Sequence, residues 1–291
     1  MLNQQQSLVK GASLMAAAFP SAAAFVDAAA VAVASLNEAG SRGRKRGRKP
    51  IVDIESVLAS IWVVANSGMQ WRILKLLKSA NWSTVHYHFL RWSRLGLWRK
   101  LALGLIAKWR KENGVENEAS VTVIDSRSVR SGPTSGERGI DGGKKVKGIK
   151  LHVLTDKFGL PLDFLVTTAN VGDRDGLRQM VPALRSNFPN ISVVLGDLGY
   201  EGAEFTAELV SSELELKTMR CGDAKTRVFV PREIRWVVER TFGWLAQWRR
   251  LAICRERNIE HYVDFAWIAI ASIVAARLAR PTTTGYVNDP A

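Results

Sequence analysis

Cysteine and histidine are scarce in this chain. Its 291 residues include 2 cysteines and 4 histidines, and Cys221 and Cys254 stand far apart without forming a CxxC pair. A Cys/His zinc site and a disulfide scaffold are both disfavoured, because each needs several such residues at short spacings. The low cysteine content fits a reducing cytoplasm.

The chain has no uninterrupted hydrophobic run of membrane-spanning length. The apolar stretch Phe265–Ala276, bounded by Asp264 and Arg277, is too short for a membrane span and predicts a buried helix. Hydrophobic residues still make up 47% of the chain, which is enough to form a core and disfavours global disorder.

Acidic residues are the minority charge. Asp and Glu number 27 against 41 Lys and Arg, giving a formal net charge of +14. Such a surplus favours a polyanionic partner, with nucleic acid ahead of an anionic membrane. The 10 tryptophans suit either nucleic-acid contacts or a core.

The first forty residues differ from the rest. Gly11–Leu36 is rich in alanine and contains Pro20 and Asp27. Small residues at 21–24 resemble a signal-peptide cleavage site, but only Lys10 precedes the run as a positive charge. We therefore expect residues 1–40 to be a variable, weakly ordered leader that is helical in part.

Residues 41–50 form a basic linker with glycines. We expect its cations to lie on DNA phosphates; the alternative is a solvated charge run. These cations are Arg42, Arg44, Lys45, Arg46, Arg48 and Lys49.

Helical periodicity predicts short helices over residues 51–112. Asp53 is expected to cap the first, Asn66–Gly68 to end it, Asn81–Ser83 to begin the second, and Gly96 to separate the second from a third. Such helices predict a helix-turn-helix-like DNA-binding domain or, equally, a plain helical packing domain. The side chains offered to DNA would be those of His88, Arg91 and Arg94.

Beyond a polar linker, the hydrophobic period changes from 3.6 to 2. The resulting order, three strands and then helix, strand, helix, strand, helix, is that of an α/β ribonuclease-H-like fold, a mixed sheet flanked by helices. We expect this domain over residues 121–279, with 280–291 as a tail. The expected strands are 121–124, 149–153, 161–168, 191–195 and 216–219, and the expected helices are 173–185, 205–214, one opened by Pro231, and 263–278.

Three acidic residues stand in distinct settings. Asp125 follows one apolar strand, Asp197 follows another, and Glu239 lies in a basic, tryptophan-rich helix. In the expected fold the two strand ends adjoin and the helix brings Glu239 to the same point. Taken singly, each has a plain alternative: an aspartate at a strand end caps a turn, and Glu239 can pair with Arg235 one turn earlier.

Together these carboxylates suit phosphoryl transfer on DNA. Such chemistry uses two divalent ions about 3.5–4 Å apart, and Mg²⁺ prefers carboxylate and water oxygens. Asp125 and Asp197 can share one ion or bridge two, with Glu239 completing a shell. No cysteine or histidine is needed, which matches their scarcity.

The motifs around these residues resemble the catalytic core of bacterial insertion-sequence DDE transposases, within them the insertion-sequence-five group. The resemblance covers about residues 42–279. Its motifs are Val-Ile-Asp-Ser-Arg-Ser-Val at 123–129, Gly-Gly-Lys-Lys-Val-Lys-Gly-Ile-Lys-Leu-His-Val-Leu-Thr-Asp at 142–156, Gly-Asp-Leu-Gly-Tyr at 196–200, Val-Glu-Arg-Thr-Phe-Gly-Trp-Leu at 238–245, and helical-domain segments at 67–72 and 82–89.

The resemblance implies a transposase that cleaves DNA at transposon ends and transfers strands into target DNA. The acidic triad of the family falls on Asp125, Asp197 and Glu239, which would hold two Mg²⁺ ions, or Mn²⁺ in their place. The implied partner is double-stranded DNA, both terminal inverted repeats and target. A homodimer on paired ends, a cytoplasmic location and no membrane association are expected.

This sequence also departs from the pattern of the family at two positions. Arg235 matches an arginine of the family, but Arg232 stands where relatives have Tyr and Ala246 where they have Lys. Two alternatives therefore stay open: a non-catalytic, domesticated or self-inhibitory DNA-binding relative, and another ribonuclease-H-like nuclease.

Further DNA contacts are expected from the loop before residue 150 and from the basic helix. The alternative for the loop lysines is that they lie on a solvated loop and do not touch DNA. In the basic helix, Trp244 is expected in the core. Trp248 is a candidate for stacking on a base. The expected contacts are Lys144, Lys145, Lys147, Lys150, Arg235, Arg240, Trp248, Arg249 and Arg250.

Overall fold

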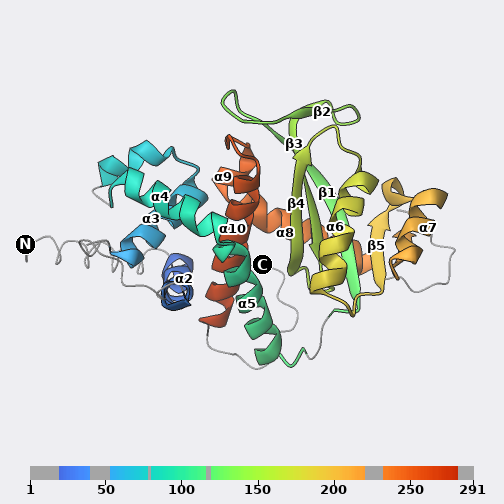
Figure 1. Cartoon of the computed structure of the whole chain (residues 1–291), viewed down its shortest axis with the longest axis horizontal. Coiled ribbons are helices and arrows are strands. Elements are labelled where there is room, and N and C mark those ends of the chain that lie inside the picture. The colour runs from blue at the N-terminus through green and yellow to red at the C-terminus, as the bar shows by residue number, and fades with distance from the viewer. Residues whose placement is uncertain (1–19, 40–52, 78–79, 116–118, 220–231, 281–291) are drawn as a thin grey trace, which may run out of the picture. The chain divides into compact units, whose positions relative to one another are not determined.

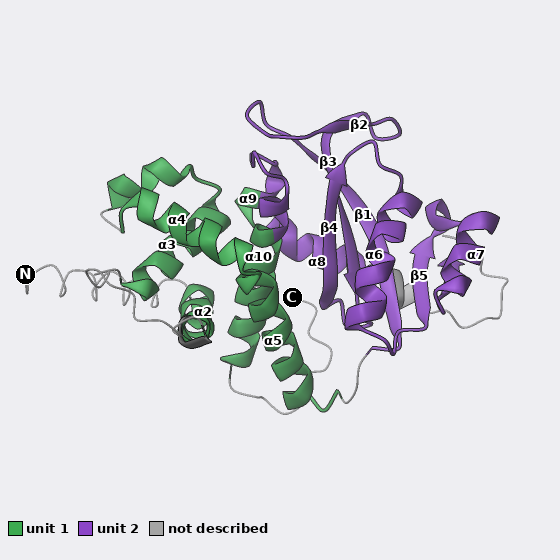
Figure 2. Ribbon diagram, viewed as in Figure 1, with its two compact units in different colours: residues 1–115, 248–250, 264–291 green, residues 116–247, 251–263 purple. Residues whose placement is uncertain are grey.

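The computed structural model describes residues 20–39, 53–77, 80–115, 119–219 and 232–280. They form two compact units, one helical and one built on a β-sheet (Figure 2). The linker cations at 42–49, which were expected to touch DNA, lie outside the described residues.

The helical unit confirms the helix boundaries expected from capping residues. The side chain of Asp53 accepts a hydrogen bond from the Glu55 N–H, and that of Asn81 accepts one from the Ser83 N–H. Gly68 and Gly96 both adopt left-handed backbone conformations at helix boundaries. The elements are α2 (Pro20–Ala39), α3 (Ile54–Ser67), η1 (Trp71–Leu77), α4 (Trp82–Arg94) and α5 (Leu97–Glu112).

Helix α2 corrects the expectation of a weakly ordered leader for residues 20–39. Phe25, Ala29 and Val33 recur every four residues and are buried, so one face of the helix is apolar. This helix packs against α3 and α5, and Phe25 stacks on Trp98. Pro20 begins the helix instead of interrupting it, since a proline is tolerated in the first turn.

The last helix, α10 (Glu260–Leu278), is long and apolar enough to cross a membrane by length and composition. Most of it is buried, and Phe265 stacks on Phe89 with ring centroids 4.8 Å apart. The predicted buried helix is therefore confirmed. From Asp264 onward the chain belongs to the helical unit, so the sheet unit ends earlier than the expected boundary at 279.

The sheet is mixed, as the ribonuclease-H-like expectation requires. Its strands are β1 (Val121–Arg130), β2 (Gly139–Asp141), β3 (Val146–Thr155), β4 (Pro161–Thr168), β5 (Val193–Asp197) and β6 (Glu215–Met219). β1 pairs antiparallel with β3, and β3 pairs antiparallel with both β2 and β4. On its other side β1 runs parallel to β5, which runs parallel to β6.

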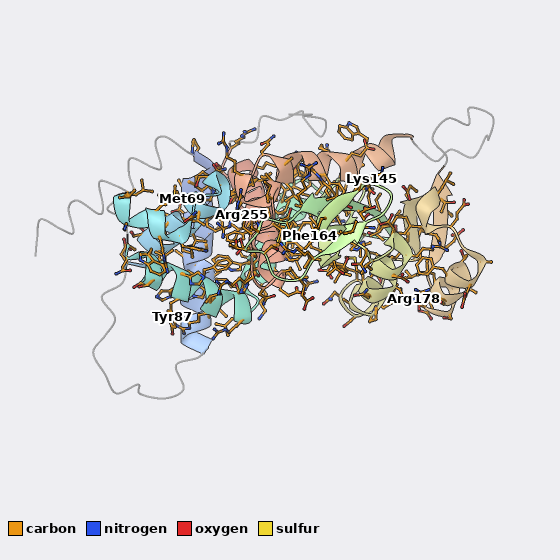
Figure 3. All side chains as sticks on the ribbon, turned by 90° about the horizontal axis from the view of Figure 1, so that it is seen from above. Met69, Tyr87, Lys145, Phe164, Arg178 and Arg255 are labelled. Atoms are coloured by element: carbon orange, nitrogen blue, oxygen red, sulfur yellow. The ribbon has the colours of Figure 1, made fainter. Side chains whose placement is uncertain are left out.

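Helices cover both faces of this sheet (Figures 1 and 3). On one face, α6 (Asp173–Asn187) and α7 (Ala203–Ser211) bury a core with Ile124 and Val194 of the strands. On the other, α8 (Arg232–Ala246) packs against β1 and β3.

Strand β1 is longer than predicted. It continues to Arg130, so Asp125 lies in the middle of a strand and not at its end. Apolar alternation could not reveal the extension, because Ser126 and Ser128 place polar groups on the face where apolar residues were expected.

Gly176 allows α6 to lie directly against the buried His152. A Cβ atom at Gly176 would stand 2.1 Å from Cε1 of that imidazole, whereas one at Gly243, in α8, would meet nothing within 4 Å. We expect Gly176→Ala to destabilise the protein by roughly 1–3 kcal/mol through overpacking. Gly243→Ala, the matched control, should stabilise it by about 0.5–1 kcal/mol through helix propensity. Thermal unfolding measures both changes, and equal midpoints for the two variants would contradict this packing.

Candidate active site

Asp125 and Asp197 occupy equivalent positions on adjacent parallel strands. β1 and β5 pair in the register Val121↔Val193 to Val123↔Leu195, and each aspartate lies two residues beyond the last pair. Equal offsets in parallel strands place two residues at the same level and on the same face. The structure therefore brings these two carboxylates to one edge of the β1–β5 pair.

The two aspartates point to the face of the sheet that α8 covers. Ile124 and Val194, which lie an odd number of residues before them on the same strands, face the core under α6 and α7, and successive side chains alternate between faces. Glu239 comes from α8 and is exposed. Among the described residues no group of three or more His, Cys, Asp or Glu side chains is close enough to hold a metal ion. Glu239 is thus carried by the helix that covers the face of the pair.

Backbone hydrogen bonds orient both carboxylates. Asp125 Oδ1 accepts from the N–H of Ser126 at 2.7 Å, and Asp197 Oδ1 accepts from the N–H of Gly199 at 2.9 Å. Two oriented carboxylates supply oxygen donors of the kind that Mg²⁺ prefers, so the pair fits a hard divalent cation.

Tyr200 lies beside both aspartates and was missed from the sequence. Its side chain is buried at the end of η2 (Leu198–Tyr200). Burial, and then the charges of Asp173, Asp125 and Asp197, raise the pKa of its hydroxyl. The phenol is therefore neutral, and it belongs to the core on the α6 side of the sheet. Asp173 was missed as well, because no residue near it in the sequence indicates that it contacts strands that lie far away along the chain.

Lys150 does not lie on the surface as expected. Its side chain is 9% exposed, and Nζ lies 3.0 Å from Oδ1 of Asp173. A buried lysine is stable only when its charge is paired. Lys150 therefore neutralises Asp173. The expectation that Lys150 contacts DNA is corrected, because its charge is already paired.

The other loop lysines remain available. Lys144, Lys145 and Lys147 are exposed around the turn between β2 and β3 (Figure 3 labels Lys145). They carry no ion pair among those found in the described part of the chain, so their charges face solvent.

Two residues expected to contact DNA are buried in the helical unit. Trp248 is 5% exposed and packs edge-on against Trp62. Arg250 is 7% exposed, and its Nη1 donates to the carbonyl of Met69 at 3.0 Å. Neither side chain presents a surface to a duplex, so both expectations are corrected. Arg249, between them, is exposed.

The basic helix α8 buries Phe242 and Trp244 and leaves Trp236 exposed. Trp244 is buried, which confirms its expected core position. The guanidinium of Arg240 lies over the rings of Trp236 and Trp244, and Nη2 donates to the carbonyl of Phe158. Burial lowers the pKa of Arg240. This arginine therefore anchors α8 to the sheet and offers little to DNA. The side chain of Arg235 lies outside the described residues.

In the helical unit, His88 packs against Trp92 with ring centroids 5.0 Å apart. Burial, and then the charge of Arg91, lower the pKa of His88, so this side chain is neutral and partly enclosed. Arg91 is half-buried and Arg94 is exposed. Of the three expected contacts in α4, Arg94 is the most accessible.

Comparison with known proteins gives three findings. Residues 116–274, more than half of the chain, match the family described as "Transposase DDE domain", and residues 30–102 match "Putative transposase of IS4/5 family". The chain is 32% identical over 156 residues to a Burkholderia cepacia protein named "Putative transposase for insertion sequence element IS402", covering 49% of this chain and 69% of that protein. The match from residue 30 also extends the similarity into α2, which the sequence motifs alone did not link to any family.

His152 makes the stability of the sheet unit depend on pH. Burial chiefly, with the charge of Lys150 opposed by that of Asp173, lowers the pKa of His152 to about 4, and its Nε2 lies 3.0 Å from the Thr167 hydroxyl. The unfolded chain takes up this proton near pH 6.5 and the folded chain does not, so the stabilisation is complete above pH 6.5 and falls toward pH 4. We expect a loss of about 2 kcal/mol between pH 7.5 and pH 5. Urea denaturation at both pH values should show a smaller loss for His152→Gln, and identical losses would contradict the assignment.

Proposed function

Because this chain belongs to the DDE transposases of the IS4/IS5 family, we propose that it cuts DNA at the ends of an insertion sequence and joins them to target DNA. Both steps are in-line phosphoryl transfers that one site can perform. The observation that carries the proposal is the Asp125–Asp197 pair, which stands at one level of two parallel strands with both carboxylates oriented by backbone N–H groups.

We assign Asp125 and Asp197 as the ligands of a divalent metal and Glu239 as the third ligand, supplied by α8. When bound, Mg²⁺ or Mn²⁺ would activate the attacking oxygen and neutralise charge on the leaving oxygen. Glu239 comes from α8, the helix that packs against β1 on the face to which the pair points. The exposed lysines of the β2–β3 turn would hold DNA phosphates.

The proposed partner is double-stranded DNA, with the terminal repeats of the element and the target as its two forms. The formal charge of +14 supports this partner. We further propose a homodimer on paired ends and a cytoplasmic location.

A second candidate is a non-catalytic DNA-binding relative. It is favoured by Ala246, which stands where relatives of this family are expected to have a lysine. The two candidates differ in whether the wild-type protein cleaves DNA that it binds.

The triad is tested by neutral, nearly isosteric variants. Asp125→Asn, Asp197→Asn and Glu239→Gln should each lower Mg²⁺-dependent cleavage of terminal-repeat DNA by roughly 10³-fold or more, because each removes a charged metal ligand. Binding of the same DNA in Ca²⁺ should persist. Glu204→Gln, an exposed glutamate of α7, is the control and should cleave normally. Full cleavage by any triad variant would refute the assignment, and binding without cleavage by the wild type would favour the second candidate.

The loop lysines are tested by salt dependence. The triple variant Lys144→Ala, Lys145→Ala, Lys147→Ala should bind DNA more weakly regardless of its sequence. The slope of log K against log salt should fall by about 0.9 for each phosphate that the variant no longer neutralises. Lys217→Ala is the control, since Lys217 lies on the edge strand β6 and pairs with Glu215. An unchanged slope in the triple variant would show that these lysines face solvent only.

A further inference from the structure

A polar cluster in which Ser126 and Lys150 are buried and Asp173 is partly exposed lies behind Asp125, on the opposite face of the sheet. Ser126 follows Asp125 directly, and its hydroxyl donates to Oδ1 of Asp173 at 2.6 Å. Lys150 Nζ donates to the same oxygen at 3.0 Å. The register pairs Ser126 with His152 and Ser128 with Lys150, so Ser126 and Lys150 share the face on which α6 begins at Asp173.

The cluster is charged although it is largely buried. Burial raises the pKa of Asp173, but the hydrogen bonds from Ser126 and Lys150, together with the charge of Lys150, outweigh that effect and leave the pKa below its usual value. Asp173 is therefore ionised and Lys150 is its counter-ion. Apolar residues of similar size often stabilise a fold as well as a buried ion pair does, so stability alone does not account for this pair.

Asp173 is linked to both aspartates of the active site. Ser126, whose hydroxyl Asp173 holds, donates its own N–H to Asp125 at 2.7 Å. Gly199, whose N–H orients Asp197, lies beside Asp173 as well. The point where a Cβ atom on Gly199 would stand is 3.0 Å from Asp197 Oδ1 and 3.6 Å from Asp173 Oδ2. One carboxylate thus accepts a hydrogen bond from the residue whose N–H orients Asp125 and lies close to the residue whose N–H orients Asp197.

We propose that Asp173, held by Lys150 and Ser126, is a positioning residue of the cleavage site, which sets Asp125 through Ser126 and supports the Gly199 turn that orients Asp197. The proposal rests on the proposed function, because the ligands it positions are those of the divalent ion. Residues that orient metal ligands typically change metal affinity by 10–100-fold when they are replaced.

The test measures binding of Mn²⁺ alone by electron paramagnetic resonance, with full-length protein and no DNA. Ser126→Ala and Asp173→Asn should weaken Mn²⁺ binding by about 10-fold or more. Ser126→Thr, which keeps the hydroxyl that Ser126→Ala removes, should restore it. Asp175→Asn is the matched control, since Asp175 lies in the same turn of α6 but pairs with Arg178 at the surface. DNA binding in Ca²⁺ should be unchanged in every variant.

A purely structural role predicts a different result. The variants would then unfold at lower temperature yet bind Mn²⁺ as tightly as the wild type while folded, which would overturn the proposal. If Asp173→Asn does not fold because Lys150 loses its counter-ion, the double variant Asp173→Asn, Lys150→Met removes both charges and is measured in its place. Normal Mn²⁺ affinity in the double variant, with affinity lost in Asp125→Asn, would reject the positioning role and leave the proposed function standing. Absence of Mn²⁺ binding by the wild type would reject both.

Discussion

The parallel pairing of β1 with β5 is the constraint on which the site depends. Three register pairs, Val121↔Val193 to Val123↔Leu195, set Asp125 and Asp197 at one level and on one face. A shift of the register by one residue would turn one carboxylate into the core under α6 and separate the pair. The buried core of Ile124 and Val194 resists that shift, so the apolar side of the strands holds the polar side in place.

The two faces of the sheet therefore hold different groups of polar residues. The α8 face presents the aspartate pair and the helix that bears Glu239. The α6 face holds the buried cluster of Ser126, Lys150 and Asp173, which reaches the active site through the backbone at Ser126. Lys150 is buried against Asp173 on the α6 face, while Lys144, Lys145 and Lys147 of the β2–β3 turn are exposed, so the proposed DNA contacts and the proposed positioning charges are separate sets.

Sequence patterns predicted the fold where the determinants are local. The caps at Asp53 and Asn81 and strand β4 follow from neighbouring residues. The failures have distant causes: Lys150 is buried because of Asp173, 23 positions away, and Arg250 because of Met69, 181 positions away. Helix α2 was expected only as the helical part of a weakly ordered leader, because an alanine-rich segment shows its apolar face only once Phe25 and Val33 have partners. The order of the motifs predicted that the two aspartates lie together. The apolar residues of β1 did not predict that this strand continues past Asp125 to Arg130.

The central claim is that one register places Asp125 and Asp197 around a single divalent ion. The most direct measurement is a crystal structure of the protein grown with Mn²⁺, in which anomalous scattering locates the metal. The account predicts a peak bonded to carboxylate oxygens of both Asp125 and Asp197. A bound Mn²⁺ held by other residues, with these two carboxylates apart, would contradict it.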